Sequence, residues 1–165
     1  MTRLSAARWR AIAVVAIAVL AVAVAGGVLT DLGPWYQGLQ QPPWKPHDRW
    51  FGPAWTIIFA LTGTAAVRAW ETAPSGEARA VTVGLFLLNA AANIGWTLLF
   101  FTMRRPDLAL WEVAILWATV AAPIVYVGRW SRATAALLLP YLVWVTFAAT
   151  VNLGVVRLNG PFGAA

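Results

Sequence analysis

The side chains best suited to chemistry in this sequence are flat rings and amides rather than acids, bases and nucleophiles. The chain has 11 tryptophans, 1 histidine and no cysteine. A Cys/His zinc site and a thiol nucleophile are therefore excluded, and the sequence carries no Ser/His/acid set, paired carboxylates or phosphate-binding glycine loop. We expect no metal site and no conventional enzyme. Indole rings offer instead wide apolar faces on which a flat ligand can stack.

Ring and amide side chains recur at helical spacing in two rows. The rows are Asn89, Asn93, Trp96 and Phe100, and further along the chain Trp144, Ala148 and Asn152. Positions three or four apart lie on one face of a helix, so each row forms a stripe. Amides in hydrocarbon commonly hold helices together, and this interpretation stays open for each asparagine alone. Taken with the first loop, the stripes favour an aromatic cavity in which a few amides orient a guest.

The elements that must position these stripes are membrane helices. Hydrophobic residues make up 61% of the chain and charged residues 11%, against roughly 25% charged residues in an ordinary globular chain. An apolar helix needs roughly 20 residues to cross the hydrocarbon layer. Such segments lie at about residues 11–30, 53–70, 80–103, 108–128 and 133–157. The sequence therefore predicts an all-α bundle of five transmembrane helices, forming one membrane domain over residues 1–165.

The charges lie mostly between these segments. The net charge of +6 builds no continuous phosphate-binding face. We therefore expect contacts with lipid head groups and no binding of nucleic acid. Arg3, Arg8 and Arg10 precede an Ala/Val run that also resembles the core of a secretory signal peptide. The length of that run favours a retained first helix.

The first loop, residues 31–52, has a distinctive composition. Residues 34–53 contain five prolines and three tryptophans. Proline presets φ and removes a backbone donor, so we expect a stiff segment without regular helix or strand. We interpret it as a lid over the membrane end of the bundle, with an interfacial anchor as the alternative. Alternating spans place this loop on the same face as the C-terminus.

Three motifs follow one another over residues 34–159. They are Trp35-Tyr36, Leu39, Pro42, Trp44 and Pro46 with Gly52-Pro53 and Trp55-Thr56; Asn93, Trp96 and Phe100-Phe101; and Pro140-Tyr141-Leu142, Trp144, Thr150 and Asn152. Together they resemble the TspO/translocator protein family, the tryptophan-rich sensory proteins. The resemblance implies a five-helix bundle, commonly a homodimer, that binds protoporphyrin IX, haem and related tetrapyrroles and, in some members, sterols.

The resemblance places the pocket tryptophans of the family at Trp55 and Trp144. We accordingly expect ligand contacts from the lid and from both stripes: Tyr36, Trp44, Pro46, Trp55, Asn93, Trp96, Phe100, Trp144 and Ala148. A tetrapyrrole carries carboxylates along one edge, and we expect these to reach the lid residues Lys45, His47 and Arg49.

The sequence also departs from the family pattern. Gln41 stands where a basic residue is common, and His47 stands where a second proline is usual. Leu153 replaces the tyrosine of the proposed sterol-recognition segment, which argues against sterol binding. Leu88 interrupts the small-residue face on which a homodimer would form, although Ala80 and Gly84 could still allow close approach.

The expected function is that of a membrane receptor or sensor in a bacterial-type cell envelope membrane. It would bind a porphyrin non-covalently and act in porphyrin transport or regulation and in the oxidative-stress response. An alternative is light- and oxygen-dependent porphyrin degradation, in which Trp55 and Trp144 take part photochemically. A third interpretation is a proton-coupled transporter built around Glu112, the one charge well inside a span. Against it, Glu112 lies close enough to the surface to be hydrated or to form a structural pair with Arg104 or Arg105.

Overall fold

The protein folds as a bundle of long helices, seen in a computed structural model that describes residues 6–163. Five of its helices are long and apolar enough to cross a membrane. They are α1 (Ala6–Leu29), α3 (Phe51–Thr72), α4 (Gly76–Thr97), α5 (Pro106–Gly128) and α7 (Leu139–Asn159). No strand occurs within residues 6–163. The predicted all-α bundle with five membrane-spanning helices is therefore confirmed.

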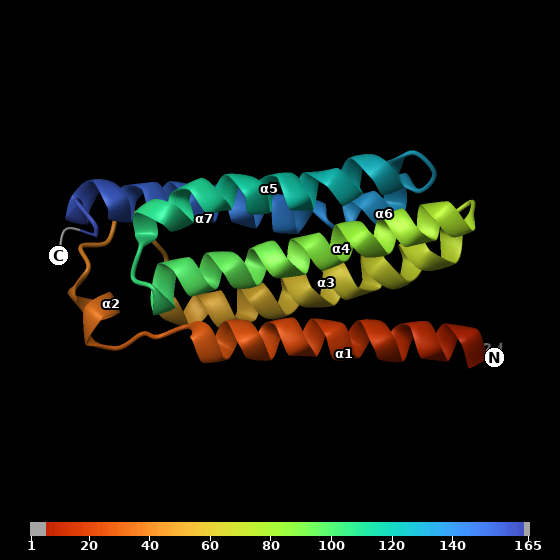
Figure 1. Ribbon diagram of the computed structural model, residues 1–165, viewed down its shortest axis with the longest axis horizontal. Coiled ribbons are helices and arrows are strands. Elements are labelled where there is room, and N and C mark those ends of the chain that lie inside the picture. The colour runs from red at the N-terminus through yellow and green to blue at the C-terminus, as the bar shows by residue number, and fades with distance from the viewer. Residues whose placement is uncertain (1–5, 164–165) are drawn as a thin grey trace.

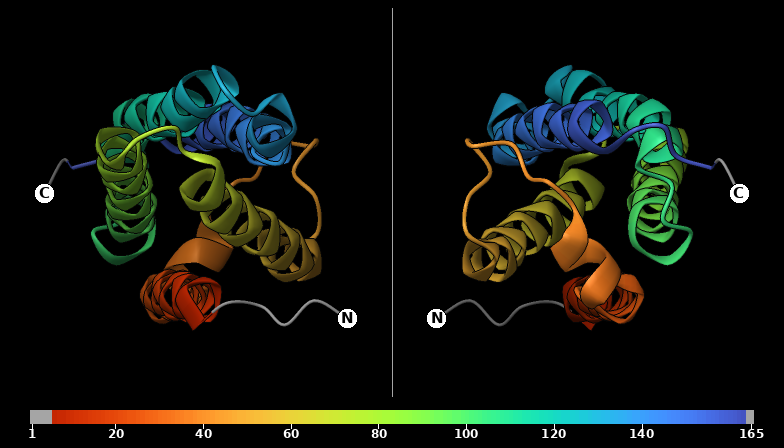
Figure 2. Two further views of the ribbon diagram at one scale, coloured as in Figure 1. Left: turned by 90° about the vertical axis from the view of Figure 1, so that its right-hand side faces the viewer. Right: turned by 90° about the vertical axis from the view of Figure 1, so that its left-hand side faces the viewer.

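The helices form a ring whose order differs from their order in the chain. α1 packs beside α3 and α4, whereas α5 packs between α4 and α7. Figure 2 looks along the bundle and shows α1 on the side opposite α5 and α7. No residue of α1 is buried within the single chain. α1 therefore closes the ring without being embedded in a tight core.

Several helix ends differ from the sequence prediction, and at α4 a polar cap extends the helix beyond the apolar segment. α4 begins four residues early, at Gly76 rather than residue 80, because the Ser75 hydroxyl accepts a hydrogen bond from the Ala78 amide at 3.0 Å. At its other end, a short π-helix, η2 (Leu98–Thr102), completes the predicted third span.

The predicted fifth span, residues 133–157, is not one continuous helix. It consists of a short α6 (Arg132–Ala136), a turn at residues 137–138 and then α7. Pro140 lies in the first turn of α7 and lacks a backbone donor, so a helix cannot run regularly through this point. The apolar pattern of residues 133–157 does not by itself predict this break.

The first loop is more regular than expected. It contains one turn of helix, α2 (Pro34–Gly38), and a 3₁₀ turn, η1 (Asp48–Trp50). Pro34 occupies the first position of α2, where its fixed φ suits a helix and its missing donor is not needed. Figure 1 shows this loop at the same end of the bundle as the C-terminus and the α4–α5 connection.

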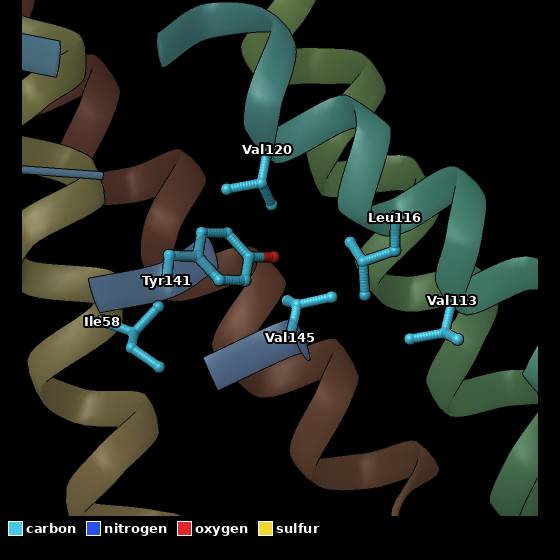
Figure 3. Close-up of a cluster of buried hydrophobic side chains, with 6 residues drawn as sticks. All are labelled: Ile58, Val113, Leu116, Val120, Tyr141 and Val145. Atoms are coloured by element: carbon cyan, nitrogen blue, oxygen red, sulfur yellow. The ribbon is translucent and has the colours of Figure 1, made fainter. Parts of the chain in front are cut away.

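The buried core lies between α3, α5 and α7. Its members are Ile58, Val113, Leu116, Val120, Tyr141 and Val145, and Figure 3 shows the Tyr141 ring among these aliphatic side chains. A second cluster joins Tyr36 of α2 to Phe100, Ala109 and Val155. This second cluster fixes the start of the loop to η2, to the first turns of α5 and to the end of α7.

Candidate functional site

The half of the bundle nearest the loop encloses a cavity of about 530 Å³. Side chains from α1, α2, α3, α4, α5 and α7 line it, together with residues of the first loop and η2. The lining includes six of the predicted ligand contacts: Tyr36, Trp55, Asn93, Trp96, Trp144 and Ala148. Two members of each stripe therefore face one shared space, which has the size of a small-molecule site. They are Asn93 and Trp96 of the first stripe and Trp144 and Ala148 of the second.

Indole and phenyl rings make one wall of this cavity. The ring centroids of Trp55 and Trp144 lie 6.4 Å apart, with their planes inclined at 79°. Trp55 stacks on Phe59 at 5.3 Å, and Trp144 meets Phe51 edge to face at 5.5 Å. Such tilted and stacked pairs hold each other in place and leave ring faces available to a planar guest.

Asn93 contributes a polar amide to this aromatic wall. Its side chain is buried, and its Nδ2 donates a hydrogen bond to the Tyr141 hydroxyl at 3.0 Å. Asn93 thus links α4 to α7 and lines the cavity at the same time. The bond to Tyr141 fixes the rotamer of the amide, so its orientation toward a ligand is set before binding.

The other three predicted ligand contacts lie outside the cavity lining. Phe100 is buried and stacks on Trp96, with centroids 5.1 Å apart. Trp44 is 54% exposed and lies against Gly154 of α7, where a Cβ atom would come within 3.3 Å of its ring. Pro46 is half-buried and also lies outside the lining.

The predicted carboxylate contacts in the loop do not line the cavity. The lining contains neither Lys45, His47 nor Arg49. His47 Nδ1 accepts a hydrogen bond from the Arg49 amide at 3.3 Å, and the Arg49 guanidinium lies over the Trp50 ring at 5.3 Å. Both side chains therefore shape the loop in this conformation.

At the mouth of the cavity, Lys45, Asp48 and Tyr36 form a connected cluster. The Tyr36 hydroxyl donates to Asp48 Oδ1 at 2.9 Å, and Lys45 Nζ forms an ion pair with the same oxygen. Burial raises the pKa of Tyr36, and the neighbouring Asp48 carboxylate raises it further, so the phenol remains a donor at neutral pH. The cluster ties η1 to α2 across the loop.

Sequence reasoning missed several residues of this site. Asp48 lines the mouth, and α1 contributes small residues at its end, including Gly26 and Gly27. A Cβ atom at either glycine would meet nothing within 4 Å, which means that α1 leaves space open here. The glycine pair in the predicted first span and the acid between His47 and Arg49 were the available signals.

Comparison with known proteins agrees with this architecture. A sequence profile of the TspO/MBR family matches residues 13–158, which is most of the chain. The chain belongs to the TspO/MBR family.

The TspO/MBR relatives come from distant organisms. The tryptophan-rich protein TspO of Chlorobaculum tepidum is 36% identical over 142 residues, covering 85% of this chain and 90% of the relative. The tryptophan-rich sensory protein of Cereibacter sphaeroides is 36% identical over 134 residues, covering 81% and 82%. The human translocator protein is 34% identical over 126 residues, covering 76% and 75%. Family membership and the five apolar helices make this chain an integral, multi-pass membrane protein.

Glu112 lies outside the cavity lining of this TspO/MBR chain. Its Oε2 is buried without a hydrogen-bond partner among residues 6–163, and its Oε1 would lie 3.8 Å from a Cβ atom at Gly95. The expected ion pair with Arg104 or Arg105 is not formed. Arg105 makes hydrogen bonds of 2.8 and 2.6 Å to Asp107 instead, and Arg104 lies 3.8 Å from Asp31. Asp107 and Asp31 lie closer to these two arginines than Glu112 does, because each acid faces its arginine at the loop end of the bundle.

Proposed function

We propose that this protein is a membrane receptor that binds tetrapyrroles such as protoporphyrin IX and haem in the aromatic cavity, and that it acts in porphyrin transport or regulation and in the oxidative-stress response. The site of action that we propose is a bacterial-type cell envelope membrane. The observation that carries the proposal is the convergence of Trp55, Trp144 and Asn93 on one cavity of about 530 Å³.

The chemistry of the cavity suits a flat apolar ring system. A tetrapyrrole needs ring-faced walls that exclude water and a few polar groups that fix its orientation. The edge-to-face pair of Trp55 and Trp144 supplies the walls, and the Asn93 amide supplies a polar point. The names of two relatives, a tryptophan-rich sensory protein and a translocator protein, accord with a receptor or transport role.

The test is a titration of the purified protein in the dark with protoporphyrin IX, haem and a sterol, followed by absorption. We expect the two tetrapyrroles to bind and the sterol to bind poorly. Trp55→Phe and Trp144→Phe should each lower tetrapyrrole affinity by about threefold to tenfold, because each removes part of a ring contact worth ~0.5–1.5 kcal/mol. Trp111→Phe is the matched control, since Trp111 is 80% exposed and lies outside the lining. Equal affinities in all four proteins would contradict the proposal.

Light- and oxygen-dependent porphyrin degradation is a second candidate function. It is favoured by the position of Trp55 and Trp144, two oxidisable indoles in the wall of the cavity. A bound porphyrin would act as the photosensitiser and dioxygen as the oxidant. Loss of the porphyrin absorption band under light in air, but not under argon, would support this function; equal loss in both, or equal loss without protein, would exclude it.

A further inference from the structure

The charged side chain that lines the cavity has the sign opposite to that of the residues predicted to receive the ligand carboxylates, Lys45, His47 and Arg49. Of the residues that line the cavity within the described range 6–163, Asp48 is the only charged one. Its carboxylate is 43% exposed and reaches the lining from η1. A ligand group that arrives at this edge of the cavity therefore meets an acid first.

Lys45, the nearest cation, is already paired with Asp48 and packed against two rings. The Lys45 side chain is only 10% exposed, and its Nζ is paired with Asp48 Oδ1. The same Nζ lies 5.5 Å from the centroid of the Tyr36 ring and 5.6 Å from that of Phe51. The ammonium has three donors and Asp48 Oδ1 takes one of them, so the low exposure of Lys45 and its two ring contacts are what limit the access of a ligand carboxylate.

Asp48 keeps unused capacity to accept hydrogen bonds. An ionised carboxylate has about four acceptor sites on two oxygens. The contacts from Tyr36 and Lys45 both fall on Oδ1. Oδ2 remains available to a ligand N–H or O–H, whereas a ligand carboxylate at the same place meets like-charge repulsion.

We propose that Asp48 is a specificity-determining residue: it makes the cavity favour planar ligands whose edge at the mouth is uncharged over ligands that carry a free carboxylate there. The proposal rests on the tetrapyrrole function proposed above. It differs from the expectation that Lys45, His47 and Arg49 receive the ligand carboxylates.

The test compares two ligands with the same ring and different charge, protoporphyrin IX and its dimethyl ester. Both are titrated in the dark into the full-length protein in neutral-lipid nanodiscs. The variants are Asp48→Asn, which keeps an acceptor for Tyr36, and Asp31→Asn, which makes the same change of charge. Asp31 lies at the start of the same loop, is outside the cavity lining and pairs with Arg104.

We expect Asp48→Asn to increase the affinity for the diacid relative to the ester by about tenfold, as for one charged contact at a partly exposed site. Asp31→Asn should leave this ratio unchanged. Lys45→Gln should move the ratio in the opposite direction, because it leaves Asp48 without its cation.

The outcomes separate the two proposals. An unchanged ratio in Asp48→Asn, or an equal shift in Asp31→Asn, overturns the specificity role and leaves tetrapyrrole binding standing. Loss of ester binding in Asp48→Asn also overturns it, because the residue would then be structural. If neither ligand binds the unaltered protein, the proposed function and the specificity role both fail.

Discussion

Three buried asparagines, Asn89, Asn93 and Asn152, have different hydrogen-bond partners. Asn89 donates from Nδ2 to Thr119 Oγ1 at 3.1 Å, and Asn93 lines the cavity while donating to Tyr141. Asn152 is 1% exposed; oriented to satisfy both neighbours, its amide donates to the Pro106 carbonyl at 3.0 Å and accepts from the Leu110 amide at 3.1 Å. Helix linkage thus accounts for Asn89 and Asn152, whereas Asn93 also borders the candidate site.

Gly154 allows the loop to lie close against α7. A Cβ atom at Gly154 would come within 2.8 Å of Pro42, which is too close for any side chain without movement. We expect Gly154→Val to displace the loop, detected as faster trypsin cleavage after Arg49. Gly38→Ala is the control, because a Cβ atom there meets nothing within 4 Å. Cleavage of Gly154→Val at the unaltered rate would show that the loop does not depend on this contact.

At the scale of elements, α4 and α5 are joined by a polar contact as well as by packing. The hydrogen bond from Asn89 to Thr119 crosses this helix pair in the buried half of both helices. Interhelical hydrogen bonds in membranes contribute less than their burial suggests, because the unfolded state in the bilayer also finds partners.

This contact can be measured with a double-mutant cycle. We expect Asn89→Ala and Thr119→Val to lower the free energy of unfolding with a coupling of about 0.6 kcal/mol, the average for such bonds. Denaturation in mixed micelles, followed by circular dichroism, gives the four free energies. Strictly additive effects would mean that packing alone joins α4 to α5.

The composition of the first loop set it apart from an ordinary connection, but it did not predict the conformation of the loop. Its prolines do stiffen the chain, yet Pro34 starts a helical turn instead of preventing one. Tertiary contacts also set the direction of the Lys45 side chain. It lies against Asp48, Tyr36 and Phe51, which sequence spacing alone does not indicate.

At the scale of the whole molecule, one outward face bears on assembly. Ala80 and Gly84 of α4 are exposed in the single chain, and a Cβ atom at Gly84 would meet nothing within 4 Å. Small residues let membrane helices approach closely, so this face is where we propose that a second copy of the chain packs.

We expect Gly84→Ile to reduce the yield of cross-linked dimer in membranes, because the added side chain separates the two backbones. Val143→Ile is the control, since Val143 of α7 is 68% exposed and lies away from α4. The same dimer yield in both variants would place any dimer contact on another face.

The sequence by itself determined the membrane class, the five spans and the family. Long uncharged segments have only one stable state in hydrocarbon, a helix with all its backbone groups paired, and the ring and amide stripes follow directly from the helical repeat.

Tertiary structure decided which stripes share a cavity and what charge borders its mouth. Trp55 on α3 and Trp144 on α7 become neighbours because the ring order of the helices differs from the chain order. Asp48 reaches the lining because the loop folds back onto α2 through the Tyr36 hydroxyl. Contacts between residues far apart in the chain depend on packing, which local spacing does not encode.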